Sequence, residues 1–194
     1  MFDLFQKTGL ILTPKSCKMF QFWNSENEVM EGDWLVTGYD HEKDKVVYEQ
    51  HKHNLIVRDG RKNVLRQTFN LDTPITGGFK FLGTGTGTTA AAVTQTALVT
   101  ELIGAPNRLT CTNTAGAALS DTDIVQETSG SFDQKIVLQG IYGTGDNNAS
   151  TLAEYGLFSQ AATGGGILFS RFVPATGIAK TSSISVTVQI TIRD

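Results

Sequence analysis

Several residue groups in this 194-residue chain have types and spacings that could support chemistry, and the first is a histidine pair. His51 and His53 lie two positions apart, so on a strand both rings would point to one face and supply half of a metal site. His41 or Glu49 could add further ligands, but no spacing in the sequence fixes such a set. Solvated or interface histidines are the favoured interpretation, and we expect no metal.

The tract Gly83–Thr89 (GTGTGTT) alternates glycine with threonine and could cradle a phosphate. A phosphate-binding loop needs Lys and then Ser or Thr directly after its final glycine, whereas Thr88, Thr89 and Ala90 follow here. We therefore favour a turn in which the glycines permit positive φ, and we expect no nucleotide or other cofactor.

Other candidate sites are weaker. Asp121 and Asp123 alternate like calcium ligands, but the glycine and distal glutamate of a calcium loop are missing, so we predict a polar turn. Cys17 and Cys111 are too far apart in sequence to indicate a zinc site or a disulfide framework, and we predict that both are reduced and buried.

Catalytic motifs are scarce. No histidine follows His53, the chain has no Gly-x-Ser-x-Gly motif, and neither cysteine neighbours a histidine in sequence. Carboxylate pairs could be assembled by folding, but no motif singles any out. The sequence predicts that the protein is not an enzyme.

Composition narrows the partners. The net charge is -3 and no run of Lys and Arg forms a basic stripe, which argues against nucleic acid. The longest apolar stretches, such as Ala90–Val93 and Ile167–Phe169, are far too short to cross a bilayer. We expect a soluble chain with neither nucleic-acid nor membrane partners.

Charge is concentrated in the first 72 residues, while Gly, Thr, Ser and Ala dominate the remainder. This shift predicts an N-terminal arm at 1–32, a hairpin plus short helix at 33–72, and a β-domain at 73–194. The hairpin would pair Asp33–Tyr39 with Lys45–His51 across a charged turn. Asn54 could cap the helix, which we place mainly at Gly60–Thr68.

Beyond residue 73 the sequence predicts strands and loops, which favours a β-sandwich, jelly-roll or Ig-like, with one short helix and an N-terminal arm. The last strand alternates most strictly, with Ile184, Val186, Val188, Ile190 and Ile192 on one face and Ser, Thr and Gln on the other. The expected strands are Phe79–Leu82, Ala97–Leu102, Arg108–Asn113, Lys135–Tyr142, Ile167–Val173 and Ser183–Ile192.

Contact surfaces are expected on the arm and on two Gly/Thr/Asn-rich loops. The aromatic residues near the N-terminus would anchor the arm on this subunit or a neighbour, in preference to forming a sugar-binding platform. The loops are Thr84–Thr89 and Gly143–Ser150. The predicted interface residues are Phe2, Phe5, Phe20, Phe22, Trp23, Thr84, Thr86, Thr88, Asn147 and Asn148.

The order of several sequence blocks resembles a group of tailed-bacteriophage virion structural proteins often labelled tail or tail-fibre-associated. The blocks are His53–Val57, Gly60, Leu65, Phe81–Thr86, Glu154–Phe158 and Gly166–Arg171, followed by an alternating terminal strand. The resemblance covers roughly residues 46 to 194 and leaves residues 1–30 without a match. It implies a β-rich domain, a place in the particle, symmetric multimers and no catalysis.

These features lead us to expect a structural virion protein, assembled in the host cytoplasm, that contacts other virion proteins at the tail, neck or baseplate and possibly holds fibres. It would form a symmetric homo-oligomer, with edge strands covered by neighbouring subunits. The alternative is a cement or decoration protein on the capsid lattice. A third hypothesis is a host-glycan-binding module, for which Tyr142 and Tyr155 are the nearby aromatic candidates.

Overall fold

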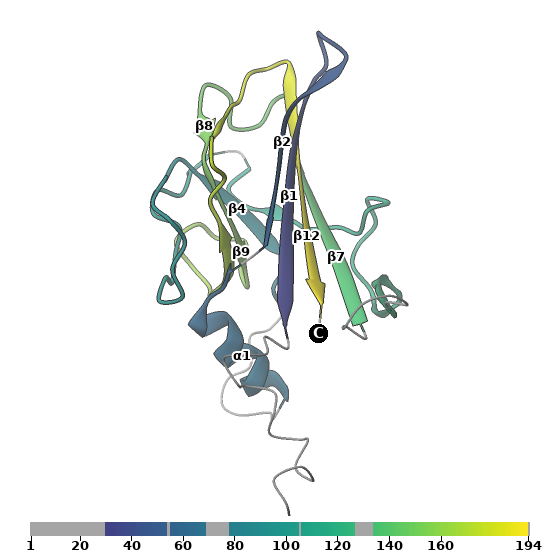
Figure 1. The fold of residues 1–194 in the computed structure, drawn as a ribbon, viewed down its shortest axis with the longest axis vertical. Coiled ribbons are helices and arrows are strands. Elements are labelled where there is room, and N and C mark those ends of the chain that lie inside the picture. Colours follow the sequence, from purple (N-terminus) through teal and green to yellow (C-terminus); the bar gives the residue numbers. More distant parts are fainter. Residues whose placement is uncertain (1–29, 54, 69–77, 105, 127–133, 194) are drawn as a thin grey trace, which may run out of the picture. The chain divides into compact units, whose positions relative to one another are not determined.

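The computed structural model describes residues 30–53, 55–68, 78–104, 106–126 and 134–193. The chain divides into two units, Met1–Met30 and Glu31–Asp194, and the architecture below is that of the second unit. This unit is mainly β, with antiparallel sheets and the helix α1 (Figure 1). The expectation of a mainly β chain with a short helix is confirmed.

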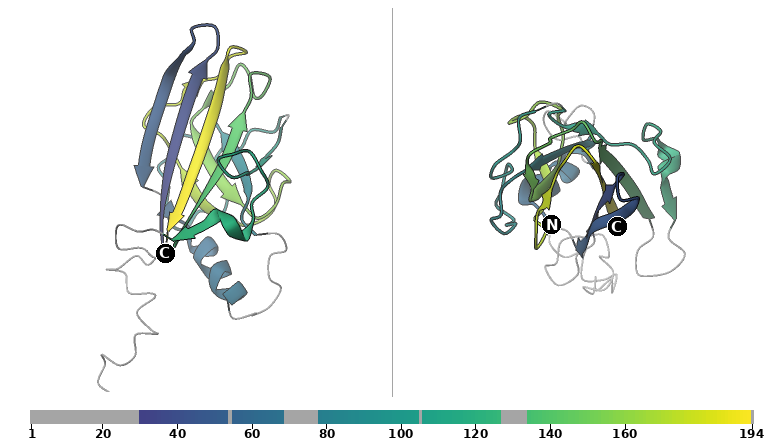
Figure 2. Two further views of the ribbon diagram at one scale, coloured as in Figure 1. Left: turned by 90° about the vertical axis from the view of Figure 1, so that its right-hand side faces the viewer. Right: turned by 90° about the horizontal axis from the view of Figure 1, so that it is seen from above.

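Two five-stranded sheets and a short ribbon make up the unit (Figures 1 and 2). The first sheet has the order β2 (Lys45–His53), β1 (Glu31–Asp40), β12 (Ile184–Arg193), β7 (Gln134–Tyr142) and β6 (Ile124–Gln126). The second has the order β3 (Leu55–Ile56), β10 (Leu168–Phe172), β9 (Glu154–Phe158), β4 (Phe81–Gly85) and β5 (Leu109–Thr110). The ribbon pairs β8 (Thr151–Leu152) with β11 (Ile178–Ala179), and a short 3-10 helix η3 spans Asp121–Asp123.

Strand β12 lies in the middle of the first sheet, between β1 and β7. Val186, Val188 and Ile190 are fully buried on one face, as the alternation predicts, while Thr187 and Gln189 on the other face are half-buried. Its ten residues pair one-to-one with those of β1. The last strand of the chain is therefore the one that ties the N-terminal hairpin to the rest of the sheet.

The two large sheets contact each other through aromatic and aliphatic side chains. Trp34 of β1 is fully buried, stacks on Phe172 of β10 at 5.8 Å between ring centroids, and donates its indole N-H to the Ser170 hydroxyl at 3.0 Å. Tyr142 of β7 donates its hydroxyl to the Leu82 carbonyl of β4 at 3.0 Å. These contacts place the core between the sheets.

The N-terminal hairpin is confirmed, and it belongs to the same sheets as the C-terminal strands. β1 pairs with β2 across a turn at residues 41–44, with a register shift between Gly38 and Tyr39. Because β1 also pairs with β12 and β3 pairs with β10, the sheets cross the expected division between 33–72 and 73–194. β1 begins at Glu31, two residues inside the predicted arm.

Helix α1 spans Arg58–Thr68, so the predicted helix at Gly60–Thr68 is confirmed and begins two residues earlier. Leu55 and Ile56, which we expected on an apolar helix face, instead form β3 and pair with Arg171 and Ser170. Gly60 occupies the first turn because a Cβ there would lie 2.5 Å from the Phe169 carbonyl oxygen. Close packing on β10 therefore selects glycine despite its poor helix propensity. Asn54, the expected cap, lies outside the described residues.

Three strand predictions are confirmed, and most of the failures concern short strands. Lys135–Tyr142, Ile167–Val173 and Ser183–Ile192 match β7, β10 and β12 within two residues. Ala97–Leu102 is not a strand, because its amides turn toward a buried side chain described below, and Arg108–Asn113 contains only β5. Strand β4 continues through Thr84 and Gly85, which we expected in a loop.

Strand β9 was not predicted, although its residues Glu154–Phe158 form one of the blocks in the family resemblance. All five of its residues are buried, so it lacks the alternation that identifies a half-buried strand. The short strands β6, β8 and β11 were also missed.

Candidate functional site: a surface loop anchored by buried charges

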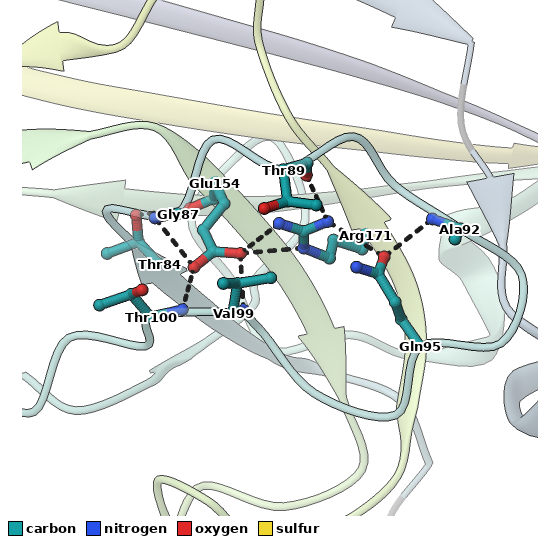
Figure 3. A network of polar contacts seen from close by, with 9 residues as sticks. All are labelled: Thr84, Gly87, Thr89, Ala92, Gln95, Val99, Thr100, Glu154 and Arg171. Atoms are coloured by element: carbon teal, nitrogen blue, oxygen red, sulfur yellow. Dashed lines mark hydrogen bonds and ion pairs between the residues drawn. The ribbon is translucent and has the colours of Figure 1, made fainter.

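A carboxylate in the core fixes the loop that follows β4 (Figure 3). Glu154, the first residue of β9, is fully buried. Its Oε1 accepts backbone N-H groups from Gly87 at 3.1 Å and Thr100 at 2.6 Å, and its Oε2 accepts the Val99 N-H at 3.0 Å. One side chain thus holds both ends of the segment from residue 87 to residue 100.

Arg171 of β10 neutralises this carboxylate from the neighbouring strand. Its side chain is fully buried, and Nε and Nη2 donate to Glu154 Oε2 at 2.9 and 2.6 Å. Its Nη1 donates to the Thr89 carbonyl at 2.9 Å and to Gln95 Oε1 at 3.0 Å (Figure 3). The two side chains and the backbone groups around them satisfy each other's hydrogen-bonding capacity, which a buried ion pair needs to be stable.

The alternating glycines of the Gly/Thr tract make room for this carboxylate. A Cβ on Gly85 or Gly87 would lie 2.5 Å from Glu154 Oε1, which is closer than real Cβ atoms approach. Neither glycine has positive φ, so the predicted reason for glycine at these positions is wrong. The tract does hold an anion on one backbone amide, that of Gly87, but that anion is the chain's own carboxylate.

A second buried ion pair fixes the adjoining loops. Arg108 donates Nε and Nη2 to Glu101 at 2.6 and 2.9 Å, and its Nη1 donates to the Gln160 and Gly165 carbonyls. The guanidinium lies 3.4 Å from the centre of the Phe158 ring. With only 1% of its side chain exposed, Arg108 links residues 101–108 to residues 160–165.

We call residues 86–104 the anchored loop, because the Glu154–Arg171 and Glu101–Arg108 ion pairs both hold this segment. It presents large apolar side chains outward: Ile103 is 82% exposed, Val99 52% and Val93 42%. Val99 is therefore held by its backbone N-H while its side chain faces solvent. A rigid loop that exposes apolar side chains can bind a partner with little loss of conformational entropy. Sequence reasoning missed these three residues because they show no periodicity.

The predicted interface residues of the tract lie in different environments. Thr84 is fully buried, and its hydroxyl donates to the Glu154 carbonyl at 3.0 Å, so its side chain is not on the surface. Thr86 is half-buried, and Thr88 is exposed on the anchored loop. The aromatic residues Phe2, Phe5, Phe20, Phe22 and Trp23 lie outside the described residues.

Residues 143–150 form a loop, as predicted. Asn147 is half-buried with φ of 49°, and Asn148 is exposed, but its side chain is engaged within the protein. Its Oδ1 accepts Lys180 Nζ at 3.0 Å, and its Nδ2 donates to the Thr144 carbonyl at 2.8 Å. Burial lowers the pKa of the Lys180 ammonium, which also donates to the Thr181 carbonyl. This lysine fixes the loop from inside.

His51 and His53 lie on one face of β2, as their spacing predicts, and both approach Asp33 of β1. His53 Nδ1 lies 2.7 Å and His51 Nε2 3.9 Å from Asp33 Oδ1, and Arg193 pairs with Asp33 Oδ2. Among the described residues, no group of three or more His, Cys, Asp and Glu side chains has the arrangement of a metal site.

Further candidate side chains lie in the core or in turns. Tyr142 and Tyr155, the glycan-binding candidates, are both fully buried, and burial raises the pKa of each phenol. Cys111 is reduced and buried, as predicted, and burial raises the pKa of its thiol to about 12, while Cys17 lies outside the described residues. Asp121 and Asp123 form the expected polar turn, in which Asn113 and the Ser120 backbone hold the pKa of Asp123 below its usual value.

Comparison with protein-family models, curated proteins and solved structures gives no match for this chain. In the part of the chain that the structure describes, no helix has the length and apolar character needed to cross a membrane.

Proposed function

We propose that this chain is a structural protein of a tailed-bacteriophage virion that assembles with other virion proteins through its surface loops and N-terminal arm. The observation that carries the proposal is where the resembling blocks lie. Phe81–Thr86, Glu154–Phe158 and Gly166–Arg171 contribute the neighbouring strands β4, β9 and β10, and the Glu154–Arg171 pair joins β9 to β10. The resemblance thus coincides with one structural unit rather than with scattered short matches.

The strand pairing supports a β-sandwich of the jelly-roll kind. β1 pairs with β12, β3 with β10, and β4 with β9, so these three pairs are nested from the two ends of the chain inward. Such nested pairing arises when one long antiparallel hairpin folds over to form two sheets, which is how a jelly roll is built. Ig-like domains instead place their first and last strands in different sheets. Jelly rolls occur in viral capsid domains, and this fold-level analogy supports a role in a particle.

The anchored loop is the proposed contact surface. Its ion pairs are internal and satisfied, so they serve to hold its backbone, while Ile103, Val99 and Val93 face outward. A capsid cement protein is the alternative, because it would need the same kind of rigid surface. Tyr142 and Tyr155, the candidate glycan-binding residues, are buried in the core and cannot stack on a sugar at the surface.

The test adds the purified chain to particles assembled without it and locates it by electron microscopy. Added density at the tail, neck or baseplate is expected, whereas density across the head lattice would establish the cement alternative. Ile103→Asp should abolish attachment, while Ala162→Asp, at another exposed loop position, should not. A chain that attaches to neither part of the particle would refute both proposals.

A further inference from the structure

The edge strands of the two large sheets differ sharply in length. Within the described residues, three of the edge strands are short: β6 has three residues, and β3 and β5 have two each. β2 has nine residues, and seven of its side chains are exposed. A long edge strand presents backbone N-H and C=O groups that can pair with another strand, and proteins usually shorten or cover such edges. β2 is therefore the edge best suited to an intermolecular contact.

The straight part of this edge runs from Tyr48 to His53. The register shift in the β1–β2 pair leaves Val47 without an opposite residue in β1, and this bulge ends the regular pairing. From Tyr48 onward each β2 residue faces one β1 residue. Glu49, His51 and His53 lie opposite Thr37, Leu35 and Asp33 on the outer face of the sheet, while Tyr48, Gln50 and Lys52 share the face of the buried Gly38, Val36 and Trp34.

This six-residue segment is complementary to itself. Two antiparallel edges related by a two-fold axis keep their outer faces on the same side, so opposite residues must have side chains on the same face. With Gln50 at the axis, Glu49 lies opposite His51 of the second copy, and Tyr48 lies opposite Lys52. Centring the axis on Glu49 instead would oppose two carboxylates, which destabilises a sheet.

We propose that β2 pairs antiparallel with β2 of a second copy of this chain, with Gln50 on the two-fold axis and two Glu49–His51 pairs across the interface. The pairing joins two five-stranded sheets into one continuous sheet. This inference rests on the proposed assembly function, because it takes a second copy of the chain as the partner that pairs with the edge strand β2.

Disulfide trapping tests the register. Cα atoms of directly opposite residues are about 4.5–5.5 Å apart, within the range of a disulfide, whereas diagonal neighbours are about 7–8 Å apart. In the full chain carrying Cys17→Ser, Gln50→Cys should therefore form a covalent dimer under mild oxidation. Glu49→Cys and His51→Cys are the matched controls, because each would lie diagonal to its own copy and should stay largely uncrosslinked. Equal crosslinking at all three positions would overturn the register.

Light scattering and sedimentation of the unmodified chain test the dimer itself. Glu49→Lys places a cation opposite His51 at two symmetric points, so the dimer dissociation constant should rise about tenfold. Glu42→Lys makes the same charge change in the β1–β2 turn, outside the pairing, and should leave it unchanged. A wild-type chain that stays monomeric up to high concentration overturns the inference. If such a monomer still attaches to particles, the proposed function stands while the edge pairing fails.

Discussion

Replacing Glu154 by glutamine tests whether the buried carboxylate holds the anchored loop. Glutamine keeps the shape of the side chain but removes its charge and one acceptor oxygen. The carboxylate accepts five hydrogen bonds, from three backbone N-H groups and from two nitrogens of Arg171. In either orientation, the glutamine NH2 group would face at least two of these donors.

The expected cost follows from the burial of Arg171. Neither side chain of the pair has exposed surface, so the substitution leaves an uncompensated guanidinium in the core. Removing one partner of a buried ion pair costs about 3–5 kcal/mol. Typical domains are stable by about 5–15 kcal/mol, so Glu154→Gln should remove a large share of the free energy of unfolding.

Urea unfolding followed by circular dichroism measures this loss, and hydrogen exchange locates it. The amides of Gly87, Val99 and Thr100 should exchange faster in the variant, because each loses part or all of its carboxylate acceptor. The control Glu42→Gln removes a carboxylate from an exposed turn and should change stability by less than about 0.5 kcal/mol.

A double variant separates the charge effect from loss of shape. Arg171→Met combined with Glu154→Gln removes both charges, so it should recover part of the stability lost in Glu154→Gln alone. The reasoning is refuted if Glu154→Gln costs under about 1 kcal/mol and the three amides keep their exchange rates. A double variant much less stable than both single variants would also contradict it.

Three further predictions concern neighbouring residues. Gly87→Ala should destabilise the protein by about 1–3 kcal/mol in urea unfolding, because its Cβ would overlap Glu154 Oε1, while Gly145→Ala, where a Cβ meets no atom within 4 Å, should be tolerated. Arg108→Lys should lower the free energy of unfolding by about 2–3 kcal/mol, since an ammonium cannot reproduce the paired hydrogen bonds to Glu101. The Gly164 amide, which donates to Glu101, should exchange faster in this variant, and an exchange rate equal to that of the wild type would contradict the prediction. Burial raises the pKa of the Cys111 thiol from 9.0 to about 12, so the folded state keeps a proton that the unfolded state loses, and this thiol should lower stability by up to about 4 kcal/mol as pH rises from about 9 to 12. Cys111→Ala should make the measured fall shallower, while the buried phenols of Tyr142 and Tyr155 keep part of it, and an unchanged slope would show that the thiol does not contribute.

Local patterns predicted the elements that depend on local spacing. The alternation from Ile184 to Ile192 identified the central strand β12, and the charged turn after Tyr39 identified the β1–β2 hairpin. Both signals come from residues close together in the sequence. A half-buried strand alternates with period two, and a hairpin turn joins two strands that are consecutive in the chain. The division at residue 72 followed composition, which does not show that β1 would pair with β12, about 150 residues later.

The anchored loop could not be predicted, because its interactions join distant parts of the chain. Glu154 meets the amides of residues 87, 99 and 100 and the guanidinium of Arg171 only after β4, β9 and β10 have paired. Burial of Tyr142 and Tyr155 likewise depends on the packing of the two sheets.

The mainly β chain, its hairpin, its helix and its terminal strand could be predicted from the sequence alone, because each depends on residues that are close together in the chain. The tertiary structure decided which charges are buried, why Gly85 and Gly87 are glycines, and which side chains face outward. These features arise from contacts across long sequence separations, where desolvation and close packing, rather than local propensity, determine the energy.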